Sequence, residues 1–512
     1  MRPLRSRPLQ ALAAGALYPL SLAPFDLWWV GVVAIAAFYW VAREEVAAHG
    51  GTRGWARLAL IGWAFGAGAF GVGASWVYVS INVYGGATPL LAGFLVLLFV
   101  SGIALLFALQ MLVWTGLLRL SGGLGANPAG PAFLFVLLWP LAEWSRSWIL
   151  TGFPWLYAGY GHLETALGAL APVGGVLAVS VAVAATGAGA VHCLTETGWR
   201  RLLAAGCTLA PWILGAGAGL AVFAEPDGRT FRVAAVQPNI DQAIKWRRDQ
   251  VQNIVDRNEA LTAPHWGSDL IVWSEASLTF TPQRGEAYLA SLDQRARAAG
   301  SALIVGIPRV GDEGEYYNSA MVLGAGNGAV YLKRHLVPFG EYVPLEAWLR
   351  GTIRFFDLPM SRNRPGPGEQ APLAFRAGEL SLSICYEIAY GELVRNAAPD
   401  PALLVTISND TWFGRSIGPL QHMQIARMRA KEMGRYLVRA TNNGVSAVVD
   451  PAGHIVASAP QFEADVVTAE VRTMTGRTPF ARFGATPLLV ALCAGVALSV
   501  LLGRRRRADI SG

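Results

Sequence analysis

Long apolar runs in the first 224 residues limit most strongly what this chain can fold into. They cover residues 9–24, 27–41, 58–81, 90–118, 132–141, 165–191 and 202–224, and an eighth follows at 485–502. A helix needs about 20 residues to cross the hydrocarbon of a bilayer, so the first, second and fifth runs are short for a span. The sequence therefore predicts a membrane α-helical bundle of about eight transmembrane helices.

The basic residues around these runs fall mainly in alternate loops. They are Arg2, Arg5 and Arg7 before the first run, Arg43, Arg53 and Arg57 after the second, Arg119 after the fourth, and Arg200 and Arg201 after the sixth, with Arg146 as the exception. Basic loops mark the cytoplasmic side, which predicts both termini in the cytoplasm and the segment between the last two runs outside it. A cleaved signal peptide is the alternative for the first run, but a second run follows at once and favours a retained anchor.

Residues 225–484 read as a water-soluble domain. Strands are expected at 231–238, 270–273, 302–307, 318–323, 380–384, 403–408 and 444–449, and helices at 246–262, 286–299, 388–398 and 422–435. Strands that alternate with helices, together with hairpin turns, predict a layered α/β domain with a mixed sheet. The chain then divides into a membrane region (1–224), this domain (225–484) and a last span with a basic tail (485–512).

The formal net charge of +7 does not indicate a nucleic-acid partner. Much of the positive charge lies in short segments beside apolar runs, where membrane topology explains it, so no nucleic acid is expected. The domain has no GxGxxG after its first strand, which disfavours a nucleotide-binding fold. The chain has neither CxxC nor HExxH spacing, so no metal site is expected.

Cys385 is the first candidate for chemistry. Of the four cysteines it is the one in the soluble domain, where it has no disulfide partner. It joins the strand-like run 380–384 to the helical pattern 388–398, and a helix N-terminus favours a thiolate over a thiol. A plain packing role is the alternative, because free Cys is among the most buried residue types.

Two charged residues end other predicted strands. Glu275 follows the run 270–273, where a carboxylate is placed to act as a general base, although helix capping is an alternative. Lys333 ends a further strand, and a fixed ammonium there would stabilise the oxyanion that forms when a thiolate attacks a carbonyl. A solvated lysine is the plainer interpretation of that residue alone.

Together these three residues resemble the Glu-Lys-Cys triad of the nitrilase superfamily. The resemblance extends to the motifs Tyr331-Leu-Lys-Arg-His-Leu-Val-Pro-Phe-Gly-Glu-Tyr-Val-Pro344, Ile384-Cys-Tyr-Glu387, Ser408-Asn-Asp-Thr-Trp-Phe-Gly414 and Thr441-Asn-Asn-Gly444. With apolar runs on both sides of the domain, nearly the whole chain resembles the apolipoprotein N-acyltransferases, which complete bacterial lipoprotein maturation. One departure is that this family commonly has prolines around Trp-Pro-Glu, whereas Ser274 and Thr279 stand here.

The resemblance implies a nitrilase-like αββα sandwich in the periplasm, attached to the bacterial inner membrane. Cys385 would attack an ester of a phospholipid, with Glu275 as base and Lys333 as oxyanion stabiliser. The resulting thioester would pass its acyl chain to the free α-amine of a diacylated apolipoprotein. No cofactor is implied, and the oligomeric state stays open.

The resemblance also implies supporting residues. The backbone N–H of Tyr386 would complete the oxyanion hole, and Glu341 and Glu387 would orient Lys333 or bind the amine. The substrate pocket would be lined by Trp246, Trp412 and Tyr342. A loop salt bridge is the alternative for Glu341, and plain packing is the alternative for the aromatic residues.

The Pro-rich segment 339–372 is long for a loop in a compact domain, which is typical of a lid or a binding element. We expect it to dip into the outer leaflet and gate lipid entry. Two other functions are open: a membrane-anchored amidase or nitrilase that uses water as second nucleophile, and a non-catalytic membrane scaffold or transporter. The number of apolar runs speaks against the first, and the intact triad with few ionisable residues in the runs speaks against the second.

Overall fold

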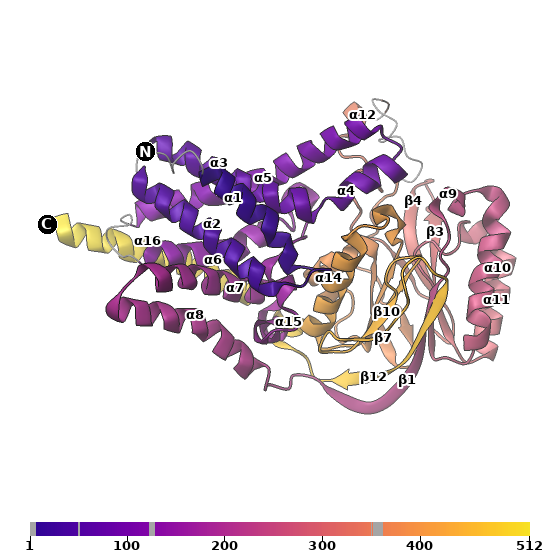
Figure 1. Ribbon diagram of the computed structural model, residues 1–512. Helices are drawn as coiled ribbons and strands as arrows, with labels where there is room; N and C mark the ends of the chain where they lie inside the picture. The colour runs from indigo at the N-terminus through magenta and orange to yellow at the C-terminus, as the bar shows by residue number, and fades with distance from the viewer. Residues whose placement is uncertain (1–6, 50–51, 122–128, 350, 352–361, 512) are drawn as a thin grey trace. The chain divides into compact units, whose positions relative to one another are not determined.

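The computed structural model describes residues 7–49, 52–121, 129–349, 351 and 362–511. The chain divides into two compact units, one made of residues 1–78, 88–222 and 482–512 and the other of residues 79–87 and 223–481. In the described chain the first unit is built from helices, and the strands belong to the second (Figure 1).

The helices of the first unit form from the apolar runs. They are α1 (Arg7–Leu17), α2 (Trp28–Ala48), α3 (Thr52–Gly73), α4 (Trp76–Val79), α5 (Pro89–Leu120), α6 (Gly130–Ser145), α7 (Ala171–Thr195), α8 (Gly198–Ala218) and α16 (Thr486–Ser511). Within the described residues, five segments are long and apolar enough to cross a membrane: Gly54–Gly73, Pro89–Leu120, Ala166–Thr195, Gly198–Ala218 and Thr486–Arg505. Helices α1, α2 and α6, which form from the three runs noted as short, are not among these five.

Helix α1 is built into the helical unit. Gly15 of α1 lies directly against the backbone of Phe65 in α3, so that a side chain at this position would not fit. The hydroxyl of Tyr18, just after α1, donates a hydrogen bond of 3.0 Å to the backbone oxygen of Leu156. At the other end of the helix, Arg7 forms an ion pair of 2.8 Å with the buried Glu45 of α2. These contacts make α1 part of the packed helical unit, and its retention in place of signal-peptide cleavage stays a prediction.

The second unit contains two six-stranded sheets, in the orders β12-β1-β2-β3-β4-β5 and β11-β10-β9-β8-β7-β6. The strands of the first sheet are β1 (Glu225–Gln237), β2 (Leu270–Val272), β3 (Ala302–Val310), β4 (Tyr316–Gly324), β5 (Val330–Leu332) and β12 (Asp465–Thr475). Those of the second are β6 (Ala374–Phe375), β7 (Gly378–Ile384), β8 (Leu403–Ser408), β9 (Leu437–Thr441), β10 (Ala447–Val449) and β11 (Ile455–Ser458).

Both sheets are mixed and follow the same pattern of pairing. Read from β12 and from β6, the successive pairs are antiparallel, parallel, parallel, antiparallel and antiparallel. Strands β1 and β7 therefore occupy equivalent places, as do β2 and β8. Parallel neighbours end at the same edge of a sheet, which gathers the residues that follow β2 in one sheet and β7 and β8 in the other.

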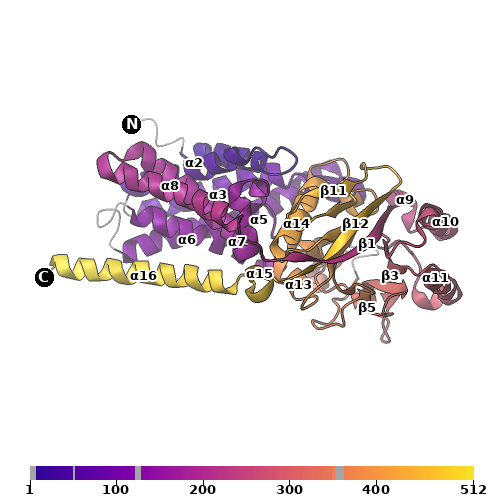
Figure 2. The same ribbon diagram turned by 90° about the horizontal axis from the view of Figure 1, so that it is seen from below.

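The unit has four layers. Apolar residues of both sheets, such as Val272 of β2 and Val405 of β8, share one core. A second core joins the first sheet to the helices α10 (Val251–Thr262) and α11 (Glu286–Ala298), and α14 (Gly418–Met433) lies on the side of the second sheet (Figures 1 and 2). This is the αββα sandwich that the resemblance implied, with two mixed sheets where the residue pattern alone predicted one.

Several predicted boundaries differ from the structure. The helix expected over 246–262 begins at Val251, and the strand expected over 444–449 is the shorter β10. Strand β9 was missed because Arg439 lies in its middle, yet all five residues of β9 are buried. Strand β12 was missed because polar and charged residues interrupt its apolar ones, and in its second half exposed residues alternate with buried ones, as in a strand with one exposed face.

Candidate active site

Cys385 follows β7 in a sharp turn. Its φ of +54° lies in the left-handed region that non-glycine residues rarely adopt. The chain continues as a short 3-10 helix, Cys385–Ala389, and then as α13 (Gly391–Arg395), so the prediction of one helix over 388–398 is wrong. A backbone conformation of this kind costs about 1–3 kcal/mol and persists where the surrounding contacts hold it, often at active sites.

The surroundings of Cys385 keep its thiol protonated. Burial and, after it, the carboxylate of Glu275 raise the pKa of Cys385 to about 12, although the ammonium of Lys333 opposes both. The expectation that a helix N-terminus favours the thiolate is therefore wrong. Burial and the negative charge of Glu275 both favour the protonated thiol, and the helical turn after Cys385 is too short to offset them. A nucleophile at this position needs a base that takes its proton.

Glu275 lies just beyond β2 and is held at both carboxylate oxygens. Its Oε1 accepts a hydrogen bond of 2.6 Å from Asn318 Nδ2, and its Oε2 accepts one of 2.8 Å from the backbone N–H of Asn409, which follows β8. The buried ammonium of Lys245 donates to the backbone oxygen of Glu275 at 3.0 Å. The carboxylate is therefore fixed in one orientation, as a base at this position requires.

Lys333 follows β5 and is only 1% exposed. Its Nζ lies 2.7 Å from Glu341 Oε2 and 3.6 Å from Glu275 Oε1. Burial lowers the pKa of Lys333, but Glu341 and Glu275 together outweigh burial and raise the pKa above its ordinary value. Lys333 is therefore an ammonium at neutral pH. The structure thus brings Cys385, Glu275 and Lys333 into one site, where their charges act on one another.

Asn318 of β4 connects the two carboxylates. Its Nδ2 donates to Glu275 Oε1 at 2.6 Å and to Glu341 Oε1 at 3.0 Å. Sequence reasoning missed this residue. The available signal was its type, because Asn is depleted in strands unless its side chain has a partner.

Glu387 is fully buried and connects two segments of the site. Its carboxylate accepts hydrogen bonds from the backbone N–H of Ile384 at 2.8 Å, of Arg334 at 2.7 Å and of His335 at 3.1 Å, and from the Tyr331 hydroxyl at 3.0 Å. It therefore fixes the segment that carries Lys333 against the turn at Cys385. Glu341 contacts Lys333 directly, whereas Glu387 acts through the backbone.

The remaining predicted residues lie around this centre. Tyr386 is buried, and its ring packs edge-on against Tyr390 with centroids 5.3 Å apart. Tyr342 accepts a backbone hydrogen bond of 2.7 Å from Phe339. Trp246 directly follows α9 (Gln242–Lys245) and is 44% exposed, and Trp412 packs against Tyr84 with ring centroids 5.9 Å apart. Their role as a substrate pocket stays a prediction.

Part of the expected lid, residues 350 and 352–361, lies outside the described residues, and with it Phe355, Phe356 and Leu358. In the described part of the same segment, Leu345 and Trp348 are exposed by 73% and 82%.

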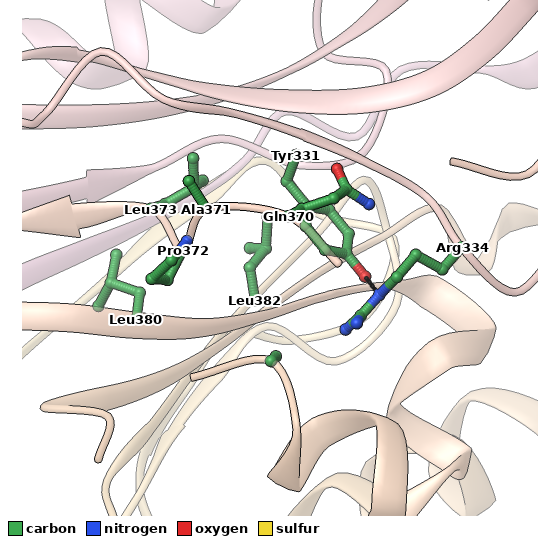
Figure 3. Close-up of a pocket in the computed structure, with 9 residues that line it drawn as sticks. Tyr331, Arg334, Gln370, Ala371, Pro372, Leu373, Leu380 and Leu382 are labelled. Atoms are coloured by element: carbon green, nitrogen blue, oxygen red, sulfur yellow. Dashed lines mark hydrogen bonds between the residues drawn. The ribbon is translucent and has the colours of Figure 1, made fainter. Parts of the chain in front are cut away.

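A small cavity lies beside Tyr331 and Arg334, bounded by β7 and the segment from Gln370 to Leu373 (Figure 3). Its volume of about 10 Å³ leaves room for about one water molecule, so it does not serve an acyl chain. In the part of the chain that the structure describes, no three His, Cys, Asp or Glu side chains are grouped to hold a metal ion.

Comparison with known proteins places both units in the same family. Residues 14–189 match the model of the apolipoprotein N-acyltransferase N-terminal domain, and residues 232–480 match that of carbon-nitrogen hydrolases. The chain is 45% identical to an apolipoprotein N-acyltransferase of Pseudomonas paraeruginosa, over 98% of this chain and 96% of the relative. It is 38% identical to that of Vibrio vulnificus, over 98% of both chains. The chain belongs to the apolipoprotein N-acyltransferase family.

Proposed function

We propose that this acyltransferase moves an acyl chain from a phospholipid to the free α-amine of the diacylglyceryl-modified N-terminal cysteine of an apolipoprotein. The reaction completes lipoprotein maturation and passes through a thioester on Cys385. We infer that the enzyme lies in the inner membrane of a bacterium, with its α/β domain in the periplasm and both termini in the cytoplasm. The alternation of basic loops along the sequence supports this orientation.

The first half-reaction acylates the cysteine. Glu275 takes the proton of the Cys385 thiol, and the thiolate attacks the ester carbonyl of the phospholipid. The ammonium of Lys333 and the backbone N–H of Tyr386 stabilise the oxyanion that forms. When the tetrahedral intermediate collapses, the bond to the glycerol oxygen breaks, this oxygen takes the proton from Glu275, and a lysophospholipid leaves.

The second half-reaction transfers the acyl chain. The neutral α-amine of the acceptor attacks the thioester, Glu275 accepts a proton from the amine, and the same donors stabilise the new oxyanion. The carbon–sulfur bond then breaks, and Cys385 recovers its proton from Glu275. Because an amide is more stable than a thioester, the transfer needs no ATP. One site can serve both substrates in turn, which is the advantage of a covalent intermediate.

The observation that carries the proposal is the position of the Lys333 ammonium. It lies 2.7 Å from Glu341 and 3.6 Å from Glu275, and its charge acts on the thiol of Cys385. This arrangement supplies a nucleophile, a base and a fixed positive charge in one buried site. The family membership of the helical unit favours a lipid donor over the small amides of a membrane-anchored amidase.

The test is to incubate the purified full-length enzyme with phosphatidylethanolamine alone and to measure its intact mass. We expect an acyl adduct on Cys385 that hydroxylamine releases, and no adduct on Cys385→Ala. A diacylated lipopeptide with a free α-amine is then added, and the acyl chain is expected on its amine. An enzyme that forms no adduct would contradict the proposal, and release of the acyl chain as free fatty acid at the same rate with and without acceptor would favour a hydrolase.

A further inference from the structure

A buried cluster of polar side chains lies behind Cys385. Asp410, His422 and Arg439 are each at most 1% exposed. Arg439 Nη2 donates to Asp410 Oδ2 at 2.7 Å, and Ser408 Oγ donates to Asp410 Oδ1 at 2.6 Å. The Nδ1 atom of His422 lies 3.0 Å from Asp410 Oδ1 and 3.0 Å from Arg439 Nη2. The charged pair of Arg439 and Asp410 therefore lies on this side of the imidazole.

The other nitrogen of His422 reaches the nucleophile. Its Nε2 lies 3.1 Å from the backbone oxygen of Cys385. A carbonyl oxygen only accepts hydrogen bonds, so Nε2 carries the proton of this bond. Asp410 and Arg439 already balance each other in charge. Burial and the charge of Arg439 lower the pKa of His422, which leaves a neutral imidazole with its proton on Nε2.

The peptide bond between Cys385 and Tyr386 connects this contact to the reaction. A trans peptide is planar, and its C=O and N–H point in opposite directions. A hydrogen bond to the oxygen of Cys385 therefore also fixes the direction of the N–H of Tyr386. It polarises the same peptide, which strengthens this N–H as a donor. Without a fixed partner for its oxygen, this peptide, with φ of +54° at Cys385, would be free to turn.

The cluster is closely fitted around Asp410. A side-chain carbon added at Gly444, in the turn between β9 and β10, would collide with the carboxylate of Asp410. The Ser408–Gly414 and Thr441–Gly444 motifs thus meet in this cluster.

We propose that His422 is a positioning residue that orients and polarises the Cys385–Tyr386 peptide so that the N–H of Tyr386 faces the oxyanion. Arg439 donates to Nδ1 and holds the imidazole for this task, and Asp410, which accepts from Ser408, holds Arg439 in place. The inference rests on the function proposed above, in which that N–H takes part in both half-reactions.

The test compares two amides at position 422 in the full-length enzyme. The amide nitrogen of a Gln reaches about as far as Nε2 of a histidine, whereas that of an Asn reaches only about as far as Nδ1. His422→Gln therefore keeps a donor for the Cys385 oxygen, and His422→Asn loses it but retains a polar group near Asp410. Both variants are compared with the wild type in the rate of acyl adduct formation from phosphatidylethanolamine. The rate of Cys385 alkylation by iodoacetamide and the melting temperature are measured in parallel, because neither uses the oxyanion hole.

We expect His422→Asn to slow adduct formation by about 10- to 100-fold, less than the loss of an oxyanion donor itself, and His422→Gln to stay within about fivefold of the wild type. Alkylation is expected to change by less than about threefold in both. Equal losses in the two variants, a parallel fall in alkylation, or an unchanged rate in His422→Asn would overturn the inference.

If His422→Asn does not fold, Asp410→Asn serves as the second variant, because it keeps the imidazole and removes the charge that holds Arg439, the donor to Nδ1 of His422. It is expected to slow adduct formation in the same direction, and a wild-type rate would overturn the inference. A wild-type enzyme that forms no adduct would contradict the proposed function itself, so the two failures are distinguishable.

Discussion

The ammonium of Lys333 lies 2.7 Å from Glu341 and 3.6 Å from the catalytic candidate Glu275. The closer carboxylate therefore forms the ion pair with the lysine, and Glu275 stays available to take a proton. In the proposed mechanism, the thiol proton moves to Glu275, the negative charge moves to the sulfur, and the Lys333–Glu341 pair stays in place to stabilise the oxyanion that forms next. These distances support different roles for the two carboxylates in the proposed mechanism, although both lie beside one ammonium.

The first prediction concerns Glu341→Gln, which removes the charge of the closer carboxylate and keeps its size. Among the groups that raise the pKa of Lys333, Glu341 is the largest, so the ammonium loses its main partner. We expect adduct formation on Cys385 to slow by about 10- to 100-fold, measured by mass spectrometry over time. Glu369→Gln, at an exposed position of the same domain, is the matched control and should keep the wild-type rate. A wild-type rate in Glu341→Gln would mean that the ion pair has no part in acylation.

The second prediction concerns the amide of Asn318, which donates to both carboxylates. Asn318→Leu keeps the approximate size and removes the donor, so Glu275 loses one of the two hydrogen bonds that fix it. We expect adduct formation to slow by about 10-fold or more. In Asn318→Asp an ionised carboxylate faces two others, so its rate at pH 7 should lie below that of Asn318→Leu. Because a protonated carboxyl donates again, the rate of Asn318→Asp relative to the wild type should rise as the pH falls. A ratio that does not change with pH would contradict this account.

The three central residues could be predicted from the sequence because each follows a recognisable apolar strand. The runs 270–273 and 380–384 are continuous or alternating apolar segments, and a single reactive side chain, Glu275 or Cys385, follows each within two residues. Parallel strands of one sheet end at the same edge. Because the two sheets face each other, Glu275, which follows β2 in the first sheet, can meet Cys385, which follows β7 in the second. The triad was therefore within reach of local patterns combined with the family resemblance.

The contacts around the triad could not be predicted in this way. Asn318 bridges two carboxylates because β4 runs antiparallel beside β3 and β5, a register that no local pattern specifies. His422 reaches the backbone of Cys385 from α14, a contact that depends on how this helix packs on the second sheet. The turn at Cys385 was predicted as a longer helix because its apolar residues Ile388 and Val394 suit a helix. The positive φ of Cys385 is a backbone feature that no local pattern in the sequence specifies.

The third prediction concerns the fit of Gly444 against Asp410. A side-chain carbon in Gly444→Ala would collide with the buried carboxylate, so either the turn or the Asp410 cluster must shift. We expect a loss of about 1–3 kcal/mol in unfolding free energy, followed by thermal or denaturant melting. Gly368→Ala is the matched control, since a carbon added there meets nothing within 4 Å, and its melting should be unchanged or slightly improved. Equal melting of the two variants would show that the cluster has room to relax.

The last prediction separates the two effects that Glu275 has on the cysteine. In the proposed mechanism it is the base that acylation requires, but its negative charge also raises the pKa of the Cys385 thiol, after the larger effect of burial. Glu275→Gln should therefore abolish adduct formation from phospholipid and at the same time speed alkylation by iodoacetamide at pH 8, because a larger fraction of the cysteine is then thiolate. Lys333→Met removes the charge that lowers this pKa, so it should slow both reactions. The measurement uses a protein in which Cys193, Cys207 and Cys493 are replaced, so that Cys385 alone reacts.

With Glu275 and Lys333 unchanged, the alkylation rate of this protein should keep rising with pH beyond 9, where the rate of an ordinary cysteine with a pKa of about 8.5 levels off. A plateau near that value, or a slower alkylation in Glu275→Gln, would show that the thiol is not held protonated by burial and by this carboxylate.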